Sequence, residues 1–163
     1  MRTAILTLLL VTAFAAPTVA TPKASPAIAP RVALPTSSGT VELDSLRGQV
    51  VLVDFWASWC EPCRKSFPWM ADIYRKYADQ GFTIVAINVD KDRDAAADFL
   101  AKLPAPFVVA FDPTGATAEA FGVRAMPSSF LVGRDGTILG THAGFDPRKV
   151  TPWEESIRAA CAR

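Results

Sequence analysis

Two cysteines three positions apart, Cys60 and Cys63, are the residues of this chain best suited to chemistry. They follow a run of β-forming residues, 50–55. Apolar residues at helical spacing come next, namely Phe67, Met70, Ile73 and Tyr77. A helix that begins at Cys60 would present unpaired N–H groups and the positive end of its dipole, which stabilise a thiolate. The pattern predicts a reactive dithiol, with Cys60 at the tip as the exposed nucleophile and Cys63 as the resolving thiol.

Two other interpretations of the same cysteines stay open. A zinc site needs a second pair of Cys or His ligands, and the chain offers only Cys161 and His142 on other segments. A passive structural disulfide needs no reactive thiolate. The spacing favours redox chemistry over both, so we expect no metal and no cofactor at this site.

The dipeptide between the cysteines bears on the direction of electron flow. Pro62 has no backbone N–H, so one donor that would solvate the Cys60 thiolate is missing. Glu61 adds a negative charge, which also disfavours the anion. A less stabilised thiolate makes the couple more reducing, and the dipeptide thus favours a reductant. If Glu61 points into solvent, however, its charge is screened and matters little.

Asp54 is the most informative polar residue, because it interrupts the apolar run VLVDFW. A carboxylate in the middle of a buried strand is costly unless it has a partner or a function. A functional acid and a structural aspartate held by a salt bridge or a water are both compatible with this position.

The other two candidate groups are not connected to the cysteine pair by spacing. His142, the only histidine, is expected to be a surface or structural residue. Cys161 aligns with Trp153 and Ile157 on one face of a helix that we expect to begin at Thr151. A buried and inert thiol is therefore predicted at Cys161.

The N-terminus has the pattern of a secretory signal peptide, residues 1–20. Arg2 is followed by an almost wholly apolar stretch, 4–16, and by small residues at 18–20. The apolar stretch is shorter than the about 20 residues that a membrane helix needs. The pattern predicts a protein secreted across the inner membrane into the periplasm, with an uncleaved anchor as the less favoured alternative.

Residues 21–32 are rich in Pro, Ala and Ser and predict a flexible linker, and residues 33–163 predict one domain. The 17 basic and 16 acidic residues are interspersed and leave a formal net charge of +1. This balance gives no electrostatic reason to expect nucleic acid or an anionic membrane surface as a partner.

Within the domain, segments of strand and helix character alternate, which predicts an α/β fold with a mixed sheet. Strands are expected at 41–43, 50–55, 82–89, 107–111, 130–132 and 137–139. The last two flank Gly133-Arg134-Asp135-Gly136, a hairpin turn. Beyond the cysteine helix, helices are expected after Asp92 or Asp94, at 117–121, and from Thr151, which with Glu154 forms a capping box.

The segment VLVDFWASWCEPCR, with Pro68 after it and Met126-Pro127 much later, resembles the thioredoxin fold. The wider outline resembles the TlpA/ResA branch of extracytoplasmic thiol-disulfide oxidoreductases, from about residue 33 onward. The resemblance implies a central mixed β-sheet flanked by helices. It further implies an N-terminal strand extension at 41–48 and a helix-strand insertion between residues 90 and 112.

The same resemblance implies roles for individual residues. Asp54 would be the general base that takes the proton of the resolving Cys63, with a pKa raised by burial. Many relatives have Asn at this position and a glutamate three residues after the second cysteine. Here that residue is Ser66, so the role of the glutamate does not transfer. Pro127 would be a cis-proline facing the dithiol.

Substrate contacts are implied as well. A cis-proline would expose the backbone of Met126 for pairing with a substrate strand beside Cys60. Together with it, the expected substrate-binding residues are Trp59, Glu61, Pro62 and Pro127.

The function implied is a periplasmic protein-disulfide reductase that works through a mixed disulfide, in cytochrome c maturation or oxidase copper-site assembly. Its partners would be a disulfide-containing protein substrate and a membrane thiol carrier that supplies electrons, and we expect a monomer. Two alternatives are a thiol oxidase or isomerase, and a copper or zinc chaperone that uses the same cysteines.

Overall fold

The computed structural model describes residues 27–163. The expected signal peptide, residues 1–20, and the start of the expected linker lie outside the described residues. Between residues 27 and 163, no helix is both long enough and apolar enough to cross a membrane.

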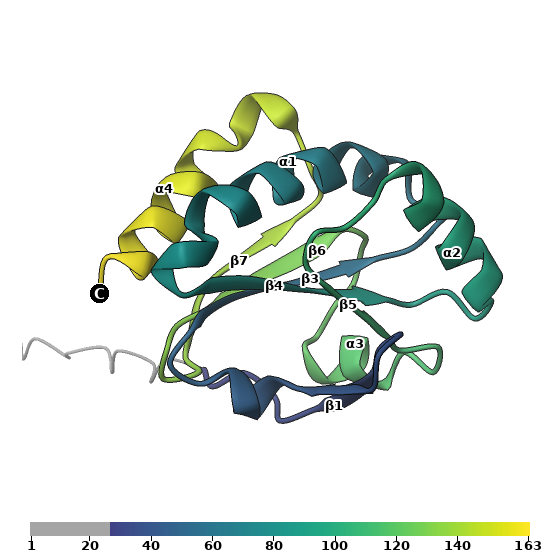
Figure 1. Ribbon diagram of the computed structural model, residues 1–163, viewed down its shortest axis with the longest axis horizontal. Helices are drawn as coiled ribbons and strands as arrows, with labels where there is room; N and C mark the ends of the chain where they lie inside the picture. Colours follow the sequence, from purple (N-terminus) through teal and green to yellow (C-terminus); the bar gives the residue numbers. More distant parts are fainter. Residues whose placement is uncertain (1–26) are drawn as a thin grey trace, which may run out of the picture.

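A five-stranded mixed sheet forms the centre of the molecule, in the order β5-β4-β3-β6-β7 (Figure 1). Its strands are β3 (Val50–Trp56), β4 (Phe82–Asn88), β5 (Val108–Phe111), β6 (Ser128–Val132) and β7 (Ile138–Ala143). β3 pairs in parallel with β4 and antiparallel with β6, while β7 closes one edge as the antiparallel partner of β6. All seven residues of β3 are buried, as the uninterrupted apolar run predicts for a central strand.

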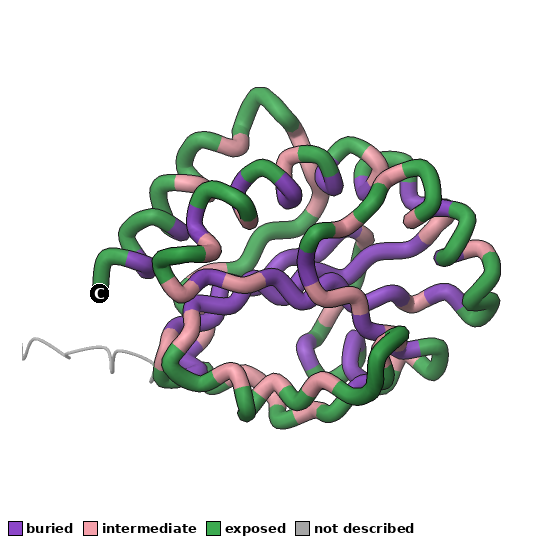
Figure 2. Tube along the Cα trace, in the orientation of Figure 1, coloured by how far each residue is buried: buried purple, intermediate pink, exposed green. Residues whose placement is uncertain are grey.

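Helices cover both faces of the sheet. Helices α1 (Glu61–Tyr77), α2 (Arg93–Lys102) and α4 (Thr151–Cys161) lie on one face, which we call the upper face. Helix α3 (Ala116–Ala120) lies on the lower face with the N-terminal hairpin (Figure 1). The buried residues concentrate along the sheet and on the helix sides that face it (Figure 2). The architecture is the thioredoxin fold that the resemblance implies.

Alternate side chains of β3 enter two separate apolar cores. On the upper face, Trp56 packs against Phe67 and Phe99, with ring centroids 4.8 and 4.6 Å away. On the lower face, Phe55 packs against Phe121 at 5.3 Å and Phe130 at 5.9 Å. Both aromatic residues of β3 are thus core residues, and the strand is fixed from above and below.

The expected insertion consists of α2 and β5. Asp92 caps α2 by accepting a hydrogen bond from the backbone N–H of Asp94 at 2.9 Å. β5 continues the sheet beyond β4 in parallel, with Val85 opposite Val108. The insertion therefore adds a strand at the sheet edge and a helix on the upper face.

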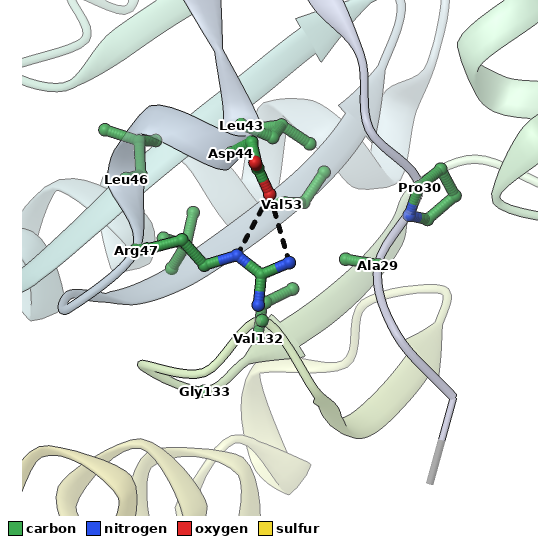
Figure 3. A pocket seen from close by; sticks show the side chains of 11 residues that line it. Ala29, Pro30, Leu43, Asp44, Leu46, Arg47, Val53, Val132 and Gly133 are labelled. Carbon is green, nitrogen blue, oxygen red and sulfur yellow. Dashed lines mark hydrogen bonds and ion pairs between the residues drawn. The ribbon is translucent and has the colours of Figure 1, made fainter.

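The expected N-terminal extension is a hairpin of β1 (Ala33–Pro35) and β2 (Thr40–Glu42), followed by a 3-10 turn (Leu43–Leu46). Leu34 is buried against the lower core. Arg47 donates to Asp44 beside a cavity of about 20 Å³ that lies between the turn, the sheet and Ala29 (Figure 3). This cavity lies on the face of the sheet opposite to α1.

Residues 27–32 differ from the flexible linker that their composition predicts. The N–H of Ala29 donates to the carbonyl of Gly136 at 2.9 Å, and the N–H of Ile138 donates to the carbonyl of Ala27 at 2.8 Å. Ala29 and Val32 also pack on the lower core. The segment is held because its backbone pairs with the start of β7 and its apolar side chains contact the lower core.

The capping box expected at Thr151 is not formed. Helical backbone already begins at Val150 (φ −77°, ψ −25°), and a 3-10 turn (Pro147–Lys149) precedes it. Thr151 is therefore inside the helix, and no side chain caps the N-terminus of α4. The helix itself, and its buried face at Ile157 and Cys161, are as predicted.

One guanidinium ties together three chain segments at the end of the molecule away from the cysteines. Arg134, in the β6–β7 turn, donates to the carbonyls of Gly48 at 2.6 Å, Gln80 at 3.0 Å and Cys161 at 3.1 Å. These carbonyls lie before β3, after α1 and at the end of α4. The starting point of β3 is thereby fixed relative to both helices above it.

Candidate active site

The two cysteines lie where β3 ends and α1 begins, and they form a disulfide with their Cα atoms 5.3 Å apart. Cys60 is the N-cap of α1, with extended backbone (φ −85°, ψ 105°). Its sulfur accepts a hydrogen bond from the N–H of Cys63 at 3.2 Å. The helix N-terminus is thus directed at the sulfur of Cys60, as the spacing predicts.

The expected exposure of Cys60 is wrong for this oxidised form. The residue is only 4% exposed, and Cys63 is fully buried. Both sulfurs belong to the upper core, where Trp56 and Phe67 are among their neighbours in the cluster. Cys60 is the outer of the two.

The residues expected to contact substrate divide into exposed and buried ones. Trp59 is 71% exposed, and Glu61 and Pro62 are also exposed. Met126 is half-buried and Pro127 is buried, and the peptide bond between them is cis. The register pairs Phe55 with Ser128, so Pro127 lies beside the end of β3, where the cysteine turn starts.

A polar group at the end of β4 holds the cysteine turn, and sequence reasoning missed it. Asp90 accepts hydrogen bonds from the backbone N–H of Ser58 at 2.8 Å and from its hydroxyl at 3.1 Å. Asn88 donates to the same carboxylate at 2.8 Å, and Arg64 donates to the carbonyl of Ser58 at 2.7 Å. The available signal was the position of Asn88 and Asp90 at the carboxyl end of a strand parallel to β3.

The charge of Glu61 is directed away from the sulfurs. The side chain faces solvent and forms an ion pair with Lys65, one turn along the helix, at 3.5 Å. The solvent-facing alternative for Glu61 therefore holds. Pro62 occupies the first turn of α1, so the missing N–H lies among the donors that point toward Cys60.

Asp54 is buried on the upper face, with 1% exposure. Burial raises its pKa to about 7, although the hydrogen bond from Ser129 acts in the opposite direction. The Ser129 hydroxyl donates to Oδ1 at 2.6 Å, while Oδ2 is buried without a partner. No ion pair among residues 27–163 involves Asp54, so the salt-bridged alternative does not apply.

Ser66 is a buried polar residue of the first turns of α1. Its hydroxyl donates to the carbonyl of Cys63 at 3.0 Å. Ser66 and Asp54 line the same small cavity, which also reaches Pro127, Ser129 and His142. Ser66 thus adds a hydrogen bond at the start of α1 and no carboxylate.

His142 is exposed on β7, as predicted for a surface residue. It also lines the small cavity that Asp54 lines. The spacing along the sequence did not reveal that His142 and Asp54 line one cavity, because their placement depends on the register of two antiparallel strand pairs.

The remaining cysteine is separate from the dithiol. Cys161 is a free thiol on the packed face of α4, and burial raises its pKa. In the part of the chain that the structure describes, no three His, Cys, Asp or Glu side chains converge as metal ligands would.

Comparison with known proteins places this site in a family. The model of the Redoxin family matches residues 16–158. The thiol-disulfide oxidoreductase ResA of Bacillus subtilis (strain 168) is 35% identical over 109 residues, which are 67% of this chain and 61% of ResA. The chain thus spans less than two thirds of the length of this relative.

Two solved structures of thiol:disulfide interchange proteins are similar to this chain over most of its length. A Chlorobium tepidum protein named as a candidate thiol:disulfide interchange protein DsbE superposes with a TM-score of 0.82 and 48% identity, covering 83% of this chain and 96% of its own. A thioredoxin-family thiol:disulfide interchange protein of Chlorobium tepidum TLS superposes with a TM-score of 0.74 and 26% identity, covering 85% and 99%.

The raised pKa of Asp54 predicts a pH-dependent stability. The folded protein holds this proton more tightly than the unfolded chain, in which the pKa is about 3.9. The favourable contribution is complete below about pH 4 and is lost as the pH rises to about 7. We expect Asp54→Asn to raise the free energy of unfolding of the oxidised protein by up to about 4 kcal/mol at about pH 8, and far less at about pH 4.

Urea unfolding at the two pH values measures this difference. Asp98→Asn, on the exposed side of α2, is the matched control and should change stability equally at both. An Asp54→Asn effect that is the same at both pH values would contradict a buried carboxyl of raised pKa.

Proposed function

This chain belongs to the Redoxin family, and on that premise we propose that it is a protein thiol-disulfide oxidoreductase that acts as a reductant outside the cytoplasm. One observation supports this above all: a Cys60–Cys63 disulfide at the N-terminus of α1, on the same face of the sheet as a buried, partly unpartnered Asp54. A dithiol needs a proton acceptor for its inner thiol, and this arrangement supplies one.

The proposed reaction has two steps. In the reduced protein, the Cys60 thiolate attacks one sulfur of a substrate disulfide, which forms a mixed disulfide and releases the first substrate thiolate. Asp54 then accepts the proton of the Cys63 thiol, and the Cys63 thiolate attacks the sulfur of Cys60. The mixed disulfide breaks, the second substrate thiolate leaves, and two electrons have passed from the protein to its substrate.

Asp54 is suited to the role of base because its pKa lies near neutrality. A group of this kind is deprotonated often enough at neutral pH to accept a proton and is basic enough to hold it. Its unpartnered Oδ2 has no competing hydrogen bond in the described part of the chain.

The direction of electron flow follows from how little the Cys60 sulfur is stabilised. Its one hydrogen bond among residues 27–163 comes from the N–H of Cys63, and Pro62 contributes no donor. A weakly stabilised thiolate means a weakly stabilised reduced form, and such a couple gives up electrons readily. The charge of Glu61 contributes little to this effect, because its side chain faces solvent and pairs with Lys65.

The partners proposed are those of a secreted reductant. The substrate is a disulfide-containing protein, docked on Trp59, Glu61, Pro62 and the Met126–Pro127 backbone. Electrons come from a membrane thiol carrier, since an oxidising periplasm does not supply them. We assign the chain, as a monomer, to cytochrome c maturation or oxidase copper-site assembly, on its similarity to ResA and to the DsbE-like structure.

Substitution of each cysteine tests the order of the two steps. Cys60→Ser should abolish disulfide reduction, because no nucleophile remains at the helix tip. Cys63→Ala should accumulate the mixed disulfide on Cys60, which mass spectrometry of the trapped protein identifies. Cys161→Ser is the control and should leave turnover unchanged, and full activity of either active-site variant would rule out this mechanism.

The reduction potential tests the direction. We expect equilibration of the wild-type dithiol with glutathione to give a value below about −200 mV, in the range of reducing thioredoxin-like proteins. Pro62→Ala restores an N–H and should shift the couple toward the dithiol, whereas Glu61→Gln should change it little. A wild-type value near about −120 mV would mean an oxidant instead.

Substitution of Asp54 tests whether this residue acts as the base. Asp54→Asn should slow the Cys63 attack on a preformed mixed disulfide by about 10²-fold or more near neutral pH. The difference should shrink as the pH approaches the pKa of the thiol, about 8.5, because the thiolate then forms unaided. Stopped-flow measurement of thiol release gives the rate, and an unchanged rate would leave Asp54 a structural residue.

A further inference from the structure

A row of three polar residues crosses the sheet from its centre to its edge. The register places Asp54 of β3 opposite Ser129 of β6, and Ser129 opposite His142 of β7. Directly paired residues on neighbouring strands point to the same face of a sheet. The three side chains therefore all lie on the upper face, beneath α1 and α4.

The row leads only toward β7. In the other direction, the residues in register with Asp54 are Ala86 of β4 and Val109 of β5, which have no polar side-chain atoms. Asp54 and Ser129 are buried, whereas His142 is exposed. Polar side chains thus form a path from the buried carboxyl to solvent.

A small cavity lies along this row. Its volume is about 10 Å³, close to what one water molecule requires. Asp54, Ser129 and His142 line it from the sheet, Trp69 lines it from α1, and Trp153 lines it from α4. The ring of His142 packs against that of Trp153, with centroids 5.9 Å apart, so these two lining residues are in contact.

The polar atoms around the cavity lack partners. Within residues 27–163, Asp54 Oδ2, Trp69 Nε1 and Trp153 Nε1 are buried with no hydrogen bond, and all three belong to residues that line the cavity. Two donors and one acceptor around a space of this size are what a buried water molecule uses. A water in this cavity would offer these three atoms a hydrogen-bond partner.

Few titratable groups face this space. His142 does so from β7, and Asp146 and Lys149 do so from the segment after it. Arg148 holds Asp146 by hydrogen bonds, which lower its pKa to about 2 and keep it anionic. From α1, Ser66 and Trp69 line the cavity, and neither side chain is titratable.

The carboxylate of Glu154, on α4, pairs with a lysine and does not face the cavity. Glu154 accepts a hydrogen bond from Lys76 at 2.6 Å and does not line the cavity. Of the groups around the cavity besides Asp54, His142 is the one whose side chain can both accept and release a proton through its two ring nitrogens.

We propose that His142 is the residue through which Asp54 exchanges its proton with solvent, by way of one water held in the cavity. The inference rests on the proposed function. The proton that leaves the Cys63 thiol protonates the Asp54 carboxylate. It then passes through the water to the neutral imidazole of His142, and the imidazolium releases it to solvent, so Asp54 is again a carboxylate. No electrons move in this relay. His142 does not react with the substrate and acts only by accepting the proton that Asp54 releases.

The first test uses the oxidised protein and needs no redox activity. The chain has one histidine, so NMR titration of its ring protons reports His142 without ambiguity. In the wild type we expect the resonance to follow a second ionisation near pH 7, from Asp54. Asp54→Asn should remove that second step from the titration curve, and identical titration curves in the two proteins would overturn the proposal.

The second test measures steady-state disulfide reduction in weak buffer, because Asp54 must lose its proton before it can serve the next turnover. His142→Phe keeps an aromatic ring against Trp153 but accepts no proton. We expect turnover to slow by about tenfold, less than the about 10²-fold or more that loss of a direct base costs. Added imidazole should restore the rate in the variant and leave the wild-type rate unchanged. An unchanged rate in His142→Phe, or a slow rate that imidazole does not restore, would contradict the relay.

Controls separate this proposal from packing effects and from the proposed function. Thr141 lies on the same exposed strand as His142, but it pairs with Phe130 and faces the lower side of the sheet. The rate of the Thr141→Ala variant should therefore match that of the wild type. His142→Gln serves as the second variant if His142→Phe fails to fold. If the wild type reduces no disulfide, the proposed function fails, and the NMR titration still decides whether Asp54 and His142 are coupled.

Discussion

A carboxyl group held in a strand that is buried on both faces is the constraint around which this molecule is built. β3 lies between two other strands and between two apolar cores, so Asp54 has neither bulk water nor a cation to stabilise its charge. Only Ser129 donates to it among the described residues. The cost of ionising this group in the folded state brings its pKa into the range in which it can exchange a proton with a thiol.

The same strand positions the dithiol. Because Trp56 and Phe55 are locked into opposite cores, the point at which β3 ends is fixed, and the turn that follows has little freedom. Asp90 and Arg64 then hold Ser58 from two sides, so Cys60 arrives at the start of α1 as its N-cap. The geometry of the sulfurs depends on packing at a distance from them as much as on the Cys-x-x-Cys spacing itself.

Sequence patterns predicted the order of elements and the dithiol because both depend on local signals. Continuous apolar runs identified β3 and β4, and Cys60-Glu61-Pro62-Cys63 identified the helix start. Features that depend on tertiary contacts were not predictable in this way. The polar row from Asp54 to His142 follows from strand register, and the burial of Cys60 follows from the aromatic cluster around it. The helical backbone at Val150, which prevents Thr151 from acting as a cap, is set by the turn before it.

Arg134 fixes the end of the molecule that lies away from the cysteines. By joining the carbonyls of Gly48, Gln80 and Cys161, it prevents the sheet and two helices from separating at the pole farthest from the sulfurs. The bond between Cys60 and Cys63 lies at the other end of β3 and α1, so the sulfurs come together and separate on a scaffold whose far end these hydrogen bonds keep fixed.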